Sequence, residues 1–120
     1  MKYKIFATKM FEKEFNKLNN YEKKRVQIIK EQLKIKPFSG KPLSHTCIRE
    51  KKVLGKRLYY FIVEERLVVV LACYGDKKTQ KIDIAKIKRL FEQQRFISIL
   101  LFFRTLYLQH FFLIVQSNRL

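Results

Sequence analysis

The chain has 120 residues, of which 27 are Lys or Arg and 10 are Asp or Glu, giving a formal net charge of +17. This length suits one domain with a modest core, and the charge favours anionic partners: nucleic acid first, an anionic membrane surface second and an acidic protein third. No Walker loop, GxGxxG, HExxH or paired-carboxylate motif occurs, which excludes ATP-dependent, nicotinamide-dependent and metalloprotease chemistry. Residues 1–90 hold 24 of the basic and 9 of the acidic residues, so the charge belongs to this part of the chain.

The two cysteines, Cys47 and Cys73, fall in predicted strands and form neither a CxxC pair nor a zinc motif. We therefore expect two buried, reduced thiols in a cytoplasmic protein. The first nine residues, MKYKIFATK, contain no apolar segment of the kind that a secretory signal requires. Both observations predict a cytoplasmic location.

The first half of the chain predicts one strand and a helical hairpin. Basic and apolar residues alternate over residues 2–7, as in a strand with one wetter face. Thr8 is a suitable N-cap for a helix whose apolar face carries Phe11, Phe15 and Leu18. Asn19, with Glu22 three residues later, is typical of a capping box that opens a second helix. The buried stripe of that helix is Val26, Ile29 and Leu33, and Pro37 ends it.

Three strands and a last helix are predicted next. In residues 43–53, one strand face would carry Cys47, Arg49, Lys51 and Val53. Residues 57–75 are mostly β-branched, aromatic or aliphatic with a polar break at 64–66, which predicts a hairpin of two antiparallel strands. Residues 67–72 include no polar residue, so we expect the second strand to be buried on both faces. Thr79 can then cap a helix with the apolar stripe Ile84, Ile87, Leu90 and Phe91.

The order β-α-α-β-β-β-α predicts an α+β fold, an antiparallel sheet with the helices packed on one face. We assign residues 1–91 to this domain and residues 92–120 to an apolar C-terminal helical extension. Residues 96–115 have about the length of a membrane span, but Arg104 interrupts them at a cost of roughly 2.5–3.5 kcal/mol. Three alternatives stay open for this tail: an apolar helix buried against the domain or a second protomer, a membrane-associated segment, or an atypical extension with little structure of its own.

Several local features occur together within residues 1–90. They are the Phe11, Phe15 and Leu18 helix, Gly55-x-Arg57 at the hairpin entrance, Glu64-Glu65 before a Val-rich strand, and Asp76-Lys77-Lys78-Thr79-Gln80 before the last helix. With the element order, these features resemble the RelE/ParE superfamily of toxins from prokaryotic toxin–antitoxin systems. The resemblance implies a small cytoplasmic toxin that a cognate antitoxin holds silent. RelE-like members bind the ribosomal A site and cut the mRNA there, whereas ParE-like members share the fold, inhibit DNA gyrase and lack the nuclease residues.

Cleavage of RNA without metal requires groups that orient the ribose 2′-OH, remove its proton, stabilise the phosphorane and protonate the leaving oxygen. The resemblance places Arg57 on the family's strand-three arginine and Lys77 near the basic position that ends the next strand, so both are candidates to stabilise the transition state. RelE-like nucleases carry a Tyr or His beyond that strand; here residues 79–83 have neither, and Asp83 lies closest to the expected place. Tyr74, His45 or a lysine of lowered pKa are open alternatives for the base. The candidate RNA-binding residues are Arg49, Lys51, Lys52, Lys56 and Lys78.

We expect these cations to gather at one border of the sheet and to meet a phosphate backbone together. The predicted function is that of a toxin, a ribosome-dependent mRNA endoribonuclease that needs no metal or other cofactor and has a cognate antitoxin, the ribosome and mRNA as partners. A ParE-like gyrase inhibitor is one alternative, supported by the missing Tyr or His, and a non-catalytic basic RNA-binding module is another. Arg57 as an ordinary strand-end cation, and Lys77 and Lys78 as a solvated approach to the last helix, are the plainer interpretations.

Overall fold

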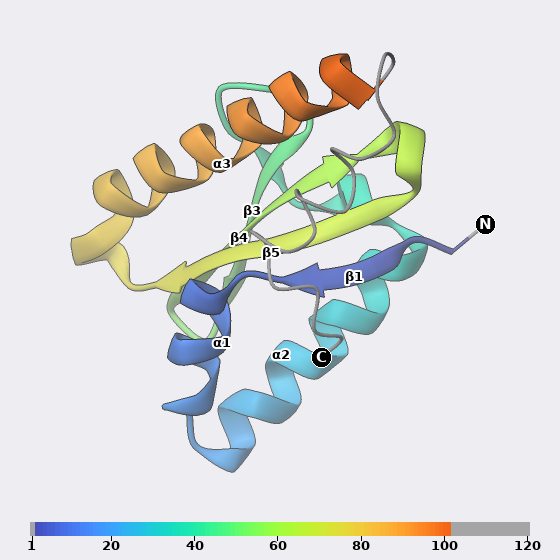
Figure 1. The fold of residues 1–120 in the computed structure, drawn as a ribbon. Coiled ribbons are helices and arrows are strands. Elements are labelled where there is room, and N and C mark those ends of the chain that lie inside the picture. Colours follow the sequence, from blue (N-terminus) through green and yellow to red (C-terminus); the bar gives the residue numbers. More distant parts are fainter. Residues whose placement is uncertain (1, 102–120) are drawn as a thin grey trace.

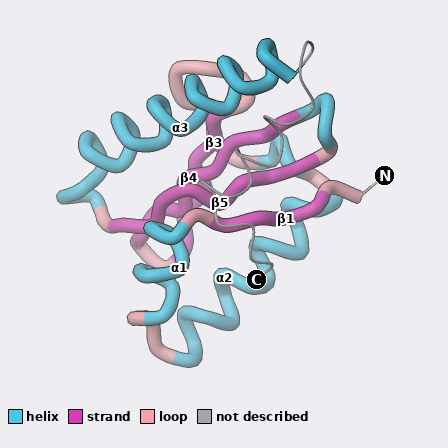
Figure 2. Tube along the Cα trace, viewed as in Figure 1, coloured by secondary structure: helices cyan, strands magenta, loops and turns pink. Residues whose placement is uncertain are grey.

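The computed structural model describes residues 2–101 as a sheet with helices packed against it (Figures 1 and 2). The helices are α1 (Lys9–Asn16), α2 (Asn20–Ile35) and α3 (Gln80–Leu101). The strands are β1 (Lys4–Ala7), β2 (Lys41–Pro42), β3 (Ile48–Val53), β4 (Lys56–Val63) and β5 (Val68–Gly75). Three short 3-10 turns occur at Pro37–Ser39, Glu64–Arg66 and Lys77–Thr79. The predicted α+β class is confirmed, and β2 is a short strand that the sequence pattern did not predict.

The helical hairpin forms as its caps and stripes predict. The Thr8 hydroxyl accepts a hydrogen bond from the Phe11 amide at 3.0 Å, and Asn19 Oδ1 accepts one from the Glu22 amide at 2.8 Å. Each bond satisfies a donor that the first helical turn leaves without a partner. The buried residues of the two stripes are Phe11, Leu18, Val26, Ile29 and Leu33.

The sheet has the order β1-β5-β4-β3-β2 and is mixed, because β1 pairs with β5 in parallel while the other pairs are antiparallel. The predicted purely antiparallel sheet is therefore wrong. The alternation in residues 2–7 carries no information about strand direction or neighbour. What decides both is β5, which is buried along seven of its eight residues and needs backbone partners on both of its edges. β4 supplies one edge through the hairpin, and β1 supplies the other.

Helices cover both faces of the sheet, so the prediction that they pack on one face is also wrong. The α1 and α2 side buries Leu58, Tyr60, Ile62, Val69 and Leu71. The α3 side buries Tyr59, Phe61, Val63, Val68 and Val70, together with Ile87 and Phe91 of α3. Figure 1 shows α3 on one side of the sheet and the α1–α2 hairpin on the other. Because β4 and β5 are apolar on both faces, each face requires a covering layer.

The last helix differs from its prediction at its start. A 3-10 turn at Lys77–Thr79 precedes α3, and Asp76 caps this turn, because its Oδ1 accepts from the Thr79 amide at 3.1 Å. Thr79 comes directly before the first residue of α3, and its hydroxyl donates to Asp83 Oδ2. α3 then continues through the predicted domain boundary at residue 91 to Leu101. No helix among the described residues is long and apolar enough to span a membrane. Most of the 92–120 extension lies outside the described residues, so the division into two segments stays a prediction.

Candidate functional site

Arg57, the first candidate, enters the sheet at the start of β4. It pairs with Lys52 on β3 and with Gly75 on β5, and its side chain lies on the α3 face. Its Nε lies 3.4 Å from Oε1 of Glu50, and the two side chains are 14% and 4% exposed. The Nε–H makes no aligned hydrogen bond among the described residues, so charge holds this pair. The positive group proposed to meet a phosphate thus already has an anionic partner inside the protein.

Two further polar side chains complete the surroundings of this pair. Gln80, the first residue of α3, donates from Nε2 to the same Glu50 Oε1 at 3.2 Å. Tyr59 stands directly opposite Glu50 in the β3–β4 register and is fully buried, and its hydroxyl has no hydrogen-bond partner among the described residues. Burial raises the pKa of Tyr59 to about 12, with the charges of Glu50 and Asp83 adding to the shift. We call Glu50, Arg57, Tyr59 and Gln80 the Arg57 cluster.

Asp83, proposed as a base, connects α3 to the end of β5. Its side chain is buried, and its Oδ2 accepts a hydrogen bond from the Thr79 hydroxyl at 2.7 Å. Both side chains lie against Gly75: a Cβ added there would sit 2.4 Å from Asp83 Oδ2 and 2.5 Å from Thr79 Oγ1. Glycine at this strand end is what allows α3 to start so close to the sheet. Asp83 therefore has a structural role here, and its role as a base stays a prediction.

Arg49 and Lys51 lie on the opposite face from Arg57. The register pairs them with Tyr60 and Leu58, which belong to the core under α1 and α2. The Arg49 guanidinium donates to the carbonyl oxygens of Thr46 at 2.7 Å, Gly40 at 2.9 Å and Phe38 at 3.2 Å, and it lies 5.2 Å from the Phe38 ring. Lys51 Nζ donates to the Ser39 hydroxyl at 3.1 Å. These contacts hold the segment that leads into β2, and the Arg49 guanidinium is already hydrogen-bonded to backbone carbonyls of the protein.

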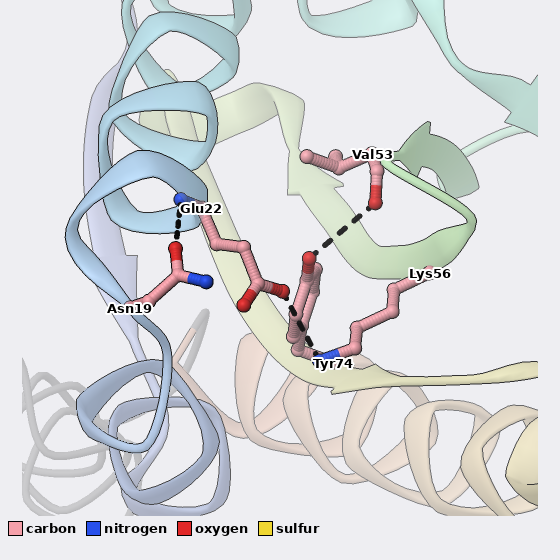
Figure 3. A network of polar contacts seen from close by, with 5 residues as sticks. All are labelled: Asn19, Glu22, Val53, Lys56 and Tyr74. Carbon is pink, nitrogen blue, oxygen red and sulfur yellow. Dashed lines mark hydrogen bonds and ion pairs between the residues drawn. The ribbon is translucent and has the colours of Figure 1, made fainter.

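Lys56 also lies on the α1–α2 side, as Figure 3 shows. Its Nζ forms an ion pair with Glu22 Oε2 at 3.1 Å and lies 5.9 Å from the centre of the Tyr74 ring. Lys52, Lys77 and Lys78 are exposed, and Lys52 shares the α3 face with Arg57. The expectation that all these cations meet at one border is therefore wrong, because strand alternation separates Arg57 and Lys52 from Arg49, Lys51 and Lys56.

A cleft of about 550 Å³ opens beside the end of β5, between α1 and the start of α3. Four lysines line it: Lys13 on α1, Lys17 just after α1, Lys56 on β4 and Lys86 on α3. Sequence analysis missed Lys13, Lys17 and Lys86, because only the fold brings α1 and α3 to the same strand end. Met10 and Ile82, both exposed, add apolar surface to the walls.

The alternative bases are placed less favourably. His45 Nδ1 accepts from the Cys47 amide at 3.0 Å, and its ring lies 4.6 Å from the Phe91 ring, so it packs along α3 two turns beyond Asp83. The Tyr74 hydroxyl donates to the Val53 carbonyl at 3.5 Å on the face opposite to Arg57, and burial raises its pKa to about 12. Lys30 has a pKa lowered first by burial, but it lies on α2. In the described part of the chain, no group of three or more His, Cys, Asp or Glu is placed to hold a metal ion.

The sequence matches no protein-family model, and no curated protein matches it. Solved structures do match. A mutant of the E. coli toxin RelE in the free state aligns with a TM-score of 0.65 and 19% identity over 74% of this chain and 98% of that one. RelE in the archaeal RelE–RelB complex from Pyrococcus horikoshii OT3 aligns with a TM-score of 0.58 and 16% identity. That alignment covers 64% of this chain and 97% of the other. A mutant of E. coli RelE bound to a RelB antitoxin peptide aligns with a TM-score of 0.60 and 20% identity, over 68% of this chain and 90% of the other.

The described residues thus form a small α+β domain whose mixed sheet carries cations on both faces of one end. This is the RelE/ParE toxin fold, as the sequence features predicted.

Proposed function

We propose that this protein is the toxin of a toxin–antitoxin pair and that it inhibits translation by cutting mRNA on the ribosome. The observation that carries the proposal is the RelE fold across most of the chain, with Arg57 at the sheet end against the start of α3. A formal charge of +17 suits a surface that must approach ribosomal RNA.

In this proposal the chain's own residues perform the chemistry without a cofactor. Arg57 and Lys77 stabilise the negative charge that develops on the phosphorane, since a guanidinium meets two phosphate oxygens and stays charged. Asp83 is the proposed base. The proposed contacts to the RNA backbone are Lys52, which shares the face of Arg57, and the exposed Lys78.

The proposed partner is a cognate antitoxin, acidic or amphipathic in sequence. The matching structures include complexes of RelE with RelB or with a RelB peptide. We propose that the toxin acts in the cytoplasm, where its mRNA target and the ribosome are found.

Inhibition of DNA gyrase is a second candidate, and the Arg57 cluster favours it. Nuclease chemistry needs a free base and a free cation, whereas Asp83 accepts from Thr79 and Arg57 is paired with Glu50. A toxin that acts by binding needs neither group to be free.

Toeprinting on translating ribosomes separates the two candidates. Cleavage of mRNA in the A site supports the nuclease, whereas inhibited supercoiling by gyrase with intact mRNA supports the second candidate. Arg57→Ala should abolish cleavage and growth arrest while barely changing RNA affinity, because one phosphate contact among many shifts affinity modestly. The matched control is Arg66→Ala, which removes the same charge from an exposed turn at the other end of β4. Equal loss of growth arrest and RNA binding in Arg57→Ala would leave only a basic binding module.

A further inference from the structure

The Arg57 cluster holds more donors than acceptors. Arg57, Gln80 and Tyr59 all present N–H or O–H groups. Glu50 Oε1 lies 3.4 Å from Arg57 Nε in an ion pair and accepts a hydrogen bond from Gln80 Nε2 at 3.2 Å. Arg57 Nε and the Tyr59 hydroxyl are buried without a hydrogen-bond partner among the described residues. A buried polar group without a partner costs about 1–3 kcal/mol. Two buried donors of the cluster therefore have no acceptor in hydrogen-bond geometry, and a differently placed acceptor oxygen would satisfy them.

We propose that the cluster is a latent phosphate site, in which the Glu50 carboxylate occupies the place of a ligand's phosphate oxygens. A carboxylate and a phosphodiester group both offer two oxygens to a guanidinium fork, so one can replace the other at Arg57. Gln80 Nε2 already donates to Glu50 Oε1, the oxygen whose place a phosphate oxygen would take. The Tyr59 hydroxyl, which has no partner among the described residues, would donate to a second phosphate oxygen. The proposed ligand is a phosphodiester of single-stranded RNA. The inference rests on the proposed function only in taking RNA as the anion.

The register provides a place for the displaced carboxylate. Glu50 and Lys52 alternate by two along β3, so they share the α3 face, and Lys52 is exposed. When a phosphate takes Arg57, the Glu50 side chain turns toward Lys52 and away from Gln80, while its backbone stays in the strand.

Glu50 thereby makes the site selective. A chain with a net charge of +17 attracts any polyanion. Because a ligand must displace the Glu50 carboxylate to reach Arg57, an anion that makes few other contacts binds this site weakly. Glu50 is the single acidic residue in positions 41–63 of the sequence, at the centre of a basic strand.

The test uses a fluorescein-labelled 2′-O-methyl RNA hexamer, which cannot be cleaved because its 2′ oxygen is blocked. Its affinity is measured by anisotropy over a series of salt concentrations with the full chain. Glu50→Gln should bind about tenfold more tightly, since it frees a charged hydrogen-bonding group. The slope of log affinity against log salt should steepen by about 0.7, because Arg57 joins the cations that neutralise phosphates. Tyr59→Phe in the Glu50→Gln background should lose part of the gain.

Three comparisons make the outcome decisive. Glu31→Gln changes the net charge equally but releases Lys34 on α2, and it should leave affinity within about twofold. Arg57→Ala combined with Glu50→Gln should lose the gain entirely. Glu50→Asp keeps the charge, shortens the side chain and should give an intermediate gain, which also serves if Glu50→Gln fails to fold. A gain that is absent, that Glu31→Gln matches or that survives the loss of Arg57 overturns the proposal. Because the probe is not cleaved, this result is independent of whether the wild-type chain cuts mRNA.

Discussion

The two faces of the sheet are built for different purposes. Under α1 and α2, the core is a continuous apolar cluster running from Ile5 on β1 to Leu33 on α2. Under α3, the apolar contacts centre on Ile87 and Phe91, and the helix start lies instead over the polar Arg57 cluster and the buried carboxylate of Asp83. Apolar burial contributes stability without direction, whereas buried charges require matched partners. We infer that the first face holds the fold together and that the second is where the chain can exchange internal partners for external ones.

Two adjacent tyrosines show the same contrast on a small scale. The Tyr60 hydroxyl, on the α2 side, donates to the Pro37 carbonyl at 2.6 Å and accepts from the Gly40 amide at 3.0 Å. The Tyr59 hydroxyl, on the α3 side, has no hydrogen-bond partner among the described residues. Both rings are fully buried. Identical side chains thus have satisfied hydroxyls on one face and an unsatisfied one on the other.

The largest effect is expected from truncating the two cores. Leu33→Ala should lower the free energy of unfolding by about 2–5 kcal/mol, and Ile87→Ala should fall at the lower end of that range, because fewer apolar groups surround α3. Urea denaturation measures the loss in the free energy of unfolding of each variant, and amide hydrogen exchange shows which elements are destabilised. We expect Leu33→Ala to raise exchange throughout the sheet and Ile87→Ala to raise it mainly in α3. Equal and global effects of both variants would show that the two faces unfold as one unit.

The contact of α3 with the strand end is tested by Gly75→Ala. A Cβ at this position would meet the side chains of Asp83 and Thr79 at 2.4 and 2.5 Å, so the first turn of α3 must move. We expect a loss of about 1–3 kcal/mol, with faster hydrogen exchange at the start of α3. Exchange in α2 should not change. Wild-type stability in this variant would contradict the close packing described above.

The tyrosine pair gives a sharper version of the comparison. Tyr60→Phe should cost about 1–3 kcal/mol, because it leaves the Pro37 carbonyl and the Gly40 amide buried without their partner. Tyr59→Phe should change stability by no more than about 0.5 kcal/mol, or should stabilise the protein, because no bond is lost. Urea denaturation of the two variants under identical conditions measures the difference. A larger loss in Tyr59→Phe would mean that its hydroxyl has a partner in solution.

The last effect is absent at neutral pH and appears only at alkaline pH. The pKa values of Tyr59 and Tyr74 are raised to about 12 from the ordinary 10.0, chiefly by burial. Because the folded state holds these protons more tightly, their contribution to stability is complete below pH 10 and is lost as pH rises toward 12. Tyr59→Phe and Tyr74→Phe should each flatten that decline by up to about 1.4 kcal/mol per pH unit. Tyr21→Phe, at a side chain that is 64% exposed, should leave it unchanged.

Local signals in the sequence predicted most elements. Thr8 and Asn19 act as caps, and the stripe of Val26, Ile29 and Leu33 is buried because side-chain spacing alone specifies a helical face. The hairpin from β4 to β5 follows from its β-branched composition and its polar break. The parallel partner of β1 and the far-side position of α3 could not be predicted, because they depend on which edge and face of β5 remain uncovered.

The candidate site was predicted in part. Sequence reasoning selected Arg57 but not Glu50. The sequence shows Glu50 as a lone acid among basic residues, whereas its burial beside Arg57 depends on the fold. Strand alternation could have separated Arg57 from Lys51, yet the β3–β4 register that fixes this depends on where the Leu54-Gly55 turn falls. The lysines of α1 and α3 carried no local signal, since only tertiary contacts place them beside β5.

The parallel pairing of β1 with β5 also bears on how the chain emerges during synthesis. The Thr8 hydroxyl donates a buried hydrogen bond to the carbonyl of Ala72, 64 positions later, so the N-terminal strand has no strand partner until that segment has been translated. The strand end that receives Arg57 is complete only at Gly75 of 120 residues. A nascent chain therefore lacks this assembled cationic strand end until Gly75 has been translated and has left the ribosome.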